Sequence, residues 1–173
     1  MISDRTLRHI RVYGAIAFVP LTKGHEALID ARNVSLVEGF NWSAKVDLRQ
    51  DGSVRNVYAH RQSKTGVVHM HRIIAGAHAG QFVDHMDGDG LNNLSANLRI
   101  CSHAQNLRNQ SISADNTSGY KGVWFHKKSS KWAAAIQIDG TRKHLGIFEN
   151  IEDAARAYAS ASEAFHGEYG RTS

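Results

Sequence analysis

The 173-residue sequence has one cysteine, one proline and no long uninterrupted apolar run. A single cysteine, Cys101, excludes an intramolecular disulfide and a zinc site built from several cysteines, and we expect it to be a small core residue. No segment approaches the roughly 20 apolar residues of a membrane span. The N-terminal MISDRTLRHIRVYG carries charges where a signal peptide is apolar. We therefore expect a cytoplasmic protein with no membrane partner.

Basic residues outnumber acidic ones. The chain has 21 Lys and Arg against 16 Asp and Glu, which gives a formal net charge of +5 and a pI near 9.5. This excess favours a polyanionic partner, with nucleic acid ahead of an anionic membrane. Hydrophobic residues make up 42% of the chain, while 15 glycines and a mean hydropathy of −0.40 favour small units with many turns.

The first part of the chain alternates short apolar runs with turns. Gln50–Ser53 separates two alternating segments and is predicted as a hairpin turn. Val67–Ala77 has apolar residues at helical spacing and is predicted as a short helix. The polar residues 111–119 are predicted as a linker.

The last part changes its period. Three β-type segments follow residue 120, and Asp139-Gly140 is predicted as a tight hairpin turn between the second and the third. After Asn150 an alanine-rich pattern at helical spacing predicts one helix, with Asn150 as its N-cap. Three strands and one packing helix would form a self-contained unit.

The stretch VDHMDGDGLNNLSANLRICSHAQN, residues 83–106, concentrates acidic, amide and imidazole groups. A neutral imidazole such as His85 is suited to taking a proton from water near neutral pH. Oxygens such as those of Asp84 and Asn106 can hold a divalent cation against a phosphate, if a strand, a loop and a helix capped by Ser102 fold around it. An EF-hand is excluded because, counted from Asp87, asparagine stands at the required glycine and leucine at the bidentate glutamate. The set indicates metal-assisted hydrolysis of a phosphodiester.

These motifs resemble the HNH (ββα-metal, His-Me finger) endonucleases, above all the homing type of phages and introns. The matches, in chain order, are Asp84-His85, the turn Asp87–Asn93, Asn97-Leu98 and Asn106. The resemblance implies that His85 is the general base, that Asn97 braces the loop, and that Asp84 and Asn106 are metal ligands. Asparagine rather than histidine at the last position favours Mg²⁺ or Mn²⁺ over zinc. Upstream, His69–Arg72 matches a helix of the family, so Arg72 is a candidate phosphate contact, while His71 either contacts the phosphate or packs.

A second resemblance covers residues 116–170. The segments SGYKGV, KWAA, LGIF and EDAARAY follow one another as in the APETALA2/ethylene-response-factor (AP2/ERF) DNA-binding domain. In that family a three-stranded sheet lies in the major groove and packs its other face on a helix. The resemblance implies that DNA is contacted by seven residues: Lys121, Trp124, His126, Lys128, Gln137, Arg142 and His144. The plant domains have arginine where Trp124 and Gln137 stand, so their target sequence is not transferred; the alternative is a solvated basic sheet face.

We therefore predict an α+β protein with two small domains: an HNH nuclease domain with an N-terminal β-rich extension (1–110), a linker (111–119) and an AP2-type domain (120–173). The resemblance implies metal-dependent cleavage of double-stranded DNA by a phage or intron homing endonuclease in a bacterial or phage-infected cell. One HNH site cuts one strand, so a monomer would nick and a dimer could break both strands. The alternatives are a non-catalytic DNA-binding regulator that retains the nuclease fold and an RNA-directed protein.

Overall fold

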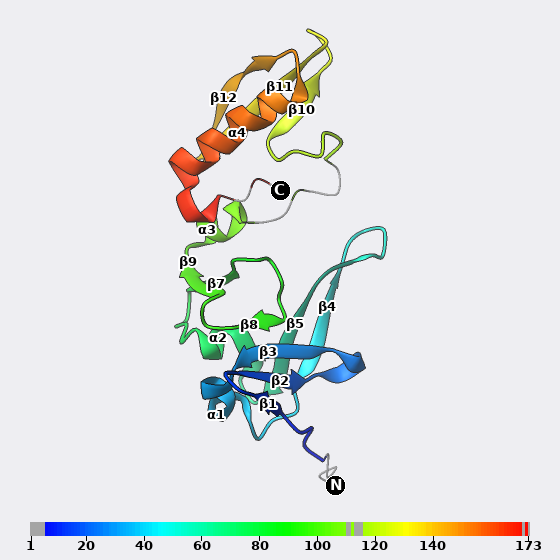
Figure 1. Ribbon diagram of the computed structural model, residues 1–173, viewed down its shortest axis with the longest axis vertical. Helices are drawn as coiled ribbons and strands as arrows, with labels where there is room; N and C mark the ends of the chain where they lie inside the picture. The colour runs from blue at the N-terminus through cyan, green and yellow to red at the C-terminus, as the bar shows by residue number, and fades with distance from the viewer. Residues whose placement is uncertain (1–5, 110–111, 113–115, 171, 173) are drawn as a thin grey trace. The chain divides into compact units, whose positions relative to one another are not determined.

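The computed structural model describes residues 6–109, 112, 116–170 and 172 (Figure 1). Internal contacts divide the chain into two compact units, residues 1–101 and 102–173, and each is described by itself. Several small sheets and a few helices make the mixed α+β class that the sequence predicts. The expected linker, residues 111–119, lies partly outside the described residues.

The first sheet of unit 1 has the order β1-β2-β3-β8. Its strands are β1 (Arg11–Tyr13), β2 (Ile16–Pro20), β3 (Glu26–Asp30) and β8 (Asn92–Asn93). Alternate residues of β2 and β3 are buried, so one face of the sheet covers the core. The short β8 runs parallel to β3, with Ile29 opposite Asn93, and it fastens a later loop of the chain to this sheet.

The second sheet has the order β4-β5-β6, with β4 (Ser43–Leu48), β5 (Val54–Ser63) and β6 (Gly66–His69). The predicted turn at Gln50–Ser53 is confirmed: it joins β4 to β5, and Gly52 has a φ of 82°. The prediction of one helix over Val67–Ala77 was wrong in its first part. Its two β-branched valines pair with β5 in β6, and α2 (Met70–Ile74) begins only afterwards.

One core connects these sheets. Its largest fully buried side chains include Trp42, Ile29 and Met70, and the indole Nε1 of Trp42 donates to the carbonyl of Val37 at 2.9 Å. The turn η1 (Thr22–Gly24) joins β2 to β3, and η2 (Ala31–Asn33) and α1 (Val34–Val37) lead from β3 to β4. Because Met70 is part of this core, α2 is held against β5 at the point where the functional residues gather.

A two-stranded hairpin completes unit 1. β7 (Phe82–His85) pairs antiparallel with β9 (Leu98–Cys101), which places Asp84 opposite Arg99 and His85 opposite Leu98. Cys101 is buried, as predicted. The connection between the two strands contains β8 and carries most of the Asp, Asn and Gly residues that the sequence singled out.

Unit 2 begins with α3 (His103–Arg108). The predicted cap is confirmed, since Ser102 Oγ accepts from the backbone N–H of Gln105 and Gln105 Oε1 accepts from the N–H of Ser102, a capping box. After it come β10 (Val123–His126), β11 (Lys131–Ile138) and β12 (Thr141–Phe148), an antiparallel sheet in that order. The long α4 (Ile151–His166) and η3 (Gly167–Tyr169) end the unit.

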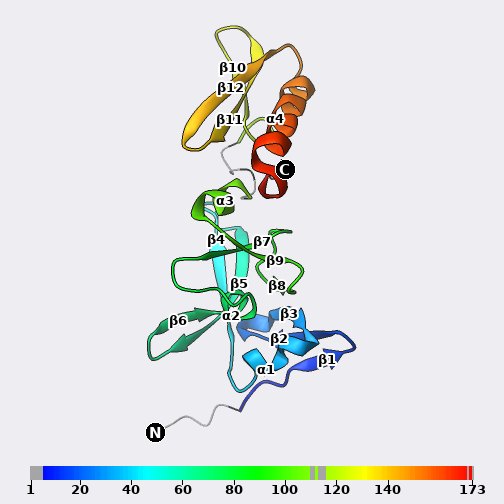
Figure 2. The same cartoon turned by 90° about the vertical axis from the view of Figure 1, so that its left-hand side faces the viewer.

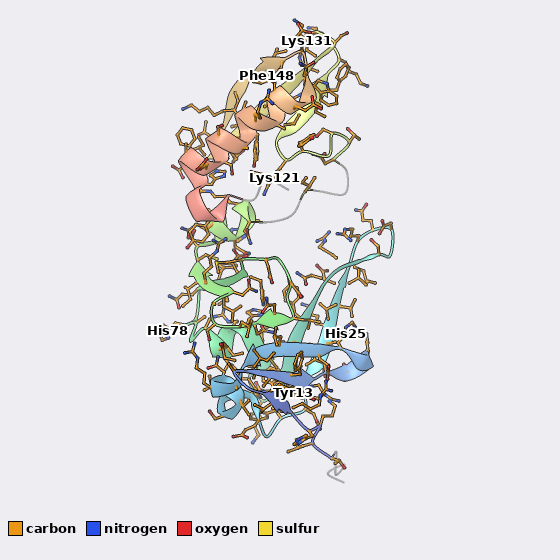
Figure 3. All side chains as sticks on the ribbon, in the orientation of Figure 1. Tyr13, His25, His78, Lys121, Lys131 and Phe148 are labelled. Carbon is orange, nitrogen blue, oxygen red and sulfur yellow. The ribbon has the colours of Figure 1, made fainter. Side chains whose placement is uncertain are left out.

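Helix α4 lies along one face of this sheet in both ribbon views (Figures 1 and 2). The helix and sheet enclose a small core, whose buried members are Val123, Ala134, Ile136, Ala154, Tyr158 and Ala161. Lys131 and Phe148, which begin β11 and end β12, lie at the same end of the sheet (Figure 3). The predicted turn at Asp139-Gly140 is confirmed by positive φ angles of 46° and 81°.

The predicted N-cap position of α4 is confirmed, because the helix begins directly after Asn150. The side chain of Asn150, however, makes no cap hydrogen bond. Its amide nitrogen instead donates to the carboxylate of Asp153 at 3.4 Å, so the amide is directed to that side chain rather than to the first turn.

Candidate active site

Asp84 is held by the strand opposite it. Its carboxylate is 7% exposed, and Oδ2 accepts hydrogen bonds from Nε and Nη2 of Arg99 at 3.0 and 2.8 Å. The antiparallel register places the two residues face to face. Charge-assisted bonds from two donors of one guanidinium fix the orientation of a carboxylate as well as its charge. Asp84 is therefore an oriented oxygen donor near the end of β7.

His85 is 5% exposed and its imidazole is oriented by a buried amide. Nε2 of His85 lies 3.2 Å from Oδ1 of Asn93. The amide nitrogen of Asn93 donates to the carbonyl of Leu91 at 3.0 Å, so the oxygen is the atom that faces the imidazole. An acceptor at that position requires the hydrogen on Nε2, which leaves the lone pair on Nδ1.

The charge state of His85 follows from its surroundings. Burial lowers its pKa below the ordinary histidine value, while the Asn93 contact and the carboxylates of Asp87 and Asp84 act in the opposite direction. The net direction is downward, so the imidazole is neutral at pH 7. A neutral imidazole with its lone pair on Nδ1 is a general base.

Asn97 closes the loop between β7 and β9. Its Oδ1 accepts from the backbone N–H of Asp87 at 3.1 Å, and its Nδ2 donates to Oδ1 of Asp87 at 2.9 Å and to the carbonyl of Asn92 at 2.8 Å. Asn92 adds a bond from its own Nδ2 to Oδ2 of Asp87 at 2.7 Å. These hydrogen bonds connect both ends of the loop, which begins directly after His85.

The loop is seated on β5 by a second asparagine. Asn56 donates from Nδ2 to the carbonyl of Gly88 and accepts at Oδ1 from the N–H of Gly90, both at 2.9 Å. Gly90 lies so close to β5 that a Cβ there would be 2.5 Å from Cδ1 of Tyr58 and from the carbonyl oxygen of Val57. Only glycine allows this approach.

Two rings from other elements surround His85. Tyr58 of β5 lies with its ring centre 6.0 Å from that of His85, and His71 of α2 lies 5.1 Å away at an interplanar angle of 82°. Burial, assisted by the neighbouring histidines and Arg72, lowers the pKa of His71 to about 3, so this imidazole is uncharged. His71 therefore packs beside His85.

Arg72 supports the turn that follows α2. Its Nη1 and Nη2 donate to the carbonyls of Gln81 and His78 at 2.5 and 2.8 Å. His78 itself projects outward from this turn (Figure 3). The guanidinium thus joins α2 to the start of β7, and a phosphate contact would have to be made in addition to these bonds.

The expected DNA-contacting residues of unit 2 fall mostly on one face of its sheet. Strand register places Gln137 opposite Arg142, and Ala135 opposite His144, on the face away from α4. Trp124 and His126 share that face by alternation along β10. The guanidinium of Arg142 lies 4.4 Å from the centre of the Trp124 ring, and the ring of His144 meets Trp124 edge-on at 6.2 Å.

The two expected lysines lie outside the strands. Lys128 is exposed in the turn between β10 and β11. Lys121 precedes β10 (Figure 3), and its Nζ donates to the carbonyl of Arg108 at 2.7 Å, which is a contact within unit 2. Five of the seven expected residues are therefore gathered on one face, and two flank it in turns.

Comparison with known proteins shows which family this chain resembles. The model of the HNH endonuclease family matches residues 68–108. Protein 3.8 of Escherichia phage T7 is 30% identical to this chain over 92 residues, which cover 53% of the chain and 75% of the phage protein. The chain belongs to the HNH endonuclease family. The matched segment runs from β6 to the end of α3 and includes Asp84, His85, Asn93, Asn97 and Asn106.

Two other relatives align with this chain over a smaller part of their own length. An uncharacterized HNH endonuclease of Acanthamoeba polyphaga mimivirus, L560, is 30% identical over 88 residues, 51% of this chain and 44% of that protein. The AP2-like ethylene-responsive transcription factor TOE2 of Arabidopsis thaliana is 37% identical over 51 residues, 30% of this chain and 10% of the plant protein. No solved structure gave a significant match. None of the helices described here is long and apolar enough to cross a membrane.

The two predicted metal ligands lie in different units. Asp84 lies on β7 of unit 1 and Asn106 lies on α3 of unit 2, so each is placed only within its own unit. Mg²⁺ commonly keeps several waters and takes only one or two protein oxygens, whereas zinc prefers three or four nitrogen and sulfur ligands. No group of three His, Cys, Asp or Glu suited to a metal occurs in the described part of the chain. The carboxylate of Asp84 therefore suits Mg²⁺ or Mn²⁺ better than zinc.

Sequence reasoning missed three residues of this site: Arg99 orients Asp84, and Asn56 and Tyr58 seat the loop. Asn93 was singled out as part of the matched turn Asp87–Asn93, but its contact with His85 was not predicted. The other three depend on strand pairing across long sequence separations.

Proposed function

We propose that this chain is a metal-dependent DNA endonuclease of the homing type. The observation that carries the proposal is the setting of His85, a buried neutral imidazole whose Nε2 faces the amide oxygen of Asn93. That arrangement directs the basic Nδ1 away from Asn93. A buried base of this kind, next to an oriented carboxylate, is what phosphodiester hydrolysis requires.

In the proposed reaction, Nδ1 of His85 takes a proton from a water molecule as the water oxygen attacks the phosphorus. A P–O bond forms, the P–O bond to the leaving sugar oxygen breaks, and that oxygen takes a proton from solvent. Asp84 and, by resemblance, Asn106 would hold the cation. When bound, Mg²⁺ or Mn²⁺ supplies positive charge to the phosphate and the leaving oxygen. His85 then releases its proton to solvent and is ready for another turnover.

Arg99 and Asn97 act indirectly in this scheme. Arg99 holds the carboxylate of Asp84 in one orientation, and Asn97 holds the loop that follows His85. Arg72 retains the role of a candidate phosphate contact through donors beyond those that hold Gln81 and His78. Each of these roles can be lost without removal of the base itself.

We further propose that residues 1–110 are the nuclease domain, 111–119 a linker and 120–173 an AP2-type DNA-binding domain. The support is the open sheet face that bears Trp124, Arg142, His144, Gln137 and His126, and the likeness to a plant AP2-like factor over 51 residues. Arginine stacked on tryptophan presents both charge and an aromatic surface to nucleic acid. This face would give affinity and sequence preference through phosphate and base-edge contacts with double-stranded DNA.

The phage and mimivirus relatives favour a homing role in an infected cell. With one HNH site in the chain, a monomer nicks one strand. A supercoiled plasmid library incubated with Mg²⁺ or Mn²⁺, against an EDTA control, tests the function. Metal-dependent nicks at recurrent mapped positions would support it; tight duplex binding without cutting would favour a regulator, and preference for RNA competitors would favour an RNA-directed protein.

A further inference from the structure

The imidazole of His85 contacts two rings from two other elements of unit 1. Tyr58 comes from β5 and His71 from α2, and the centres of both rings lie within 6.0 Å of the centre of His85. Tyr58 and His71 also contact each other, with ring centres 6.0 Å apart at 68°. The three rings thus form one mutually contacting group around the proposed base.

Each ring of this group is anchored independently of His85. The hydroxyl of Tyr58 accepts from Asn56 at 3.1 Å, and the turn at Gly90 packs directly on its ring. His71 stacks on His69 of β6, with centres 5.3 Å apart at 25°. Its buried Nδ1 has no hydrogen-bond partner among the described residues, so His71 is held by ring contacts. A wall fixed in this way can restrain the rotation of a neighbouring imidazole.

We propose that Tyr58 and His71 are positioning residues of the nuclease, a paired aromatic wall that fixes the rotation of the His85 imidazole. This rests on the proposed role of His85 as the base. The two rings act from β5 and α2, while Asn93 holds Nε2 of His85 from the loop side.

Two substitutions of His71 distinguish the effect of an aromatic ring from the effect of side-chain volume. His71→Phe keeps an aromatic ring without nitrogen atoms, whereas His71→Leu fills similar space with no ring. In single-turnover nicking of plasmid DNA with Mg²⁺, we expect His71→Leu to lower the rate roughly 3- to 30-fold at unchanged Kd, because a base that can rotate spends less time in the productive orientation. His71→Phe keeps the ring contact and should stay within about threefold of wild type. Melting temperatures identify any variant that has lost its fold.

Side-chain ¹⁵N NMR of His85 in the metal-free protein provides a readout that needs no activity. The wall predicts one sharp Nε2–H form of His85 in the wild type and in His71→Phe, and broadened or mixed signals in folded His71→Leu. Equal His85 spectra in all three proteins, or equal nicking by His71→Leu and His71→Phe, would overturn the positioning role. Absence of any metal-dependent nicking by the wild type would instead overturn the nuclease proposal. The NMR comparison would still show whether the aromatic wall orients His85.

Discussion

Asn93 is completely buried, and its amide oxygen lies 3.2 Å from Nε2 of His85. A fully buried amide is costly unless its hydrogen bonds are made, and both ends of this one are engaged, one by His85 and the other by Leu91. β8 carries Asn93 and pairs with β3 of the first sheet. The N-terminal sheet therefore orients the proposed base, although it contributes no other group to the chemistry.

The first prediction concerns this amide. Asn93→Ala removes the acceptor that selects the Nε2–H form of His85, so both forms become populated and only one is basic at Nδ1. We expect the single-turnover nicking rate to fall about 10- to 100-fold, as for other residues that orient a ligand or base, with duplex affinity unchanged. Side-chain ¹⁵N NMR should show mixed tautomers. A variant that cuts at the wild-type rate would disprove the orienting role.

The second prediction concerns the loop brace. Asn97→Ala loses three hydrogen bonds, two to Asp87 and one to Asn92. At about 1 kcal/mol for each bond, the free energy of unfolding should fall by about 3 kcal/mol, measured by urea denaturation. Asp51→Ala is the control, because it also removes side-chain bonds in a turn, but in the exposed hairpin between β4 and β5. A smaller loss for Asn97→Ala than for the control would contradict the account.

The third prediction follows from the pKa of His71. The folded value of about 3 lies below the unfolded value of 6.5, so the unfolded state binds the proton first as the pH falls. The stability contribution is complete above pH 6.5 and is lost between pH 6.5 and about 3, at up to about 1.4 kcal/mol per pH unit. His71→Phe should flatten the plot of unfolding free energy against pH in this window. An unchanged slope would show that other groups cause the acid sensitivity.

The fourth prediction concerns the open sheet face of unit 2. Arg142→Ala should weaken duplex binding and reduce the slope of log K against log salt by about one, as loss of one phosphate contact does. Arg156→Ala removes the same charge from α4, where the side chain is 76% exposed and paired with Asp153, and it should leave the slope unchanged. Equal effects of the two substitutions would mean that only net charge matters.

Local chemistry explains what the sequence could predict. The turns at Gln50–Ser53 and Asp139-Gly140 and the cap at Ser102 follow from residues within a few positions of one another, and all three are confirmed. The motifs that led to the HNH family also lie within one short stretch, residues 83–106. For such features the sequence neighbours are the spatial neighbours.

Pairing between distant segments explains what was missed. The two valines of Val67–Ala77 fit a helix by spacing, but β5 offers an open edge and they join it as β6. Arg99, Asn56 and Tyr58 reach the site only through strand register, and Asn93 acquires its role only when β8 pairs with β3. Neither periodicity nor motif spacing contains this information.

The most direct test of the central claim compares two histidine substitutions in single-turnover cleavage of supercoiled plasmid with Mg²⁺. His85→Ala should slow nicking about 100- to 10,000-fold, as loss of a general base does, with duplex affinity and melting temperature retained. His78→Ala, at the exposed histidine of the turn before β7 (Figure 3), should cut at the wild-type rate. Cleavage by His85→Ala as fast as by His78→Ala would contradict the assignment of His85 as the base.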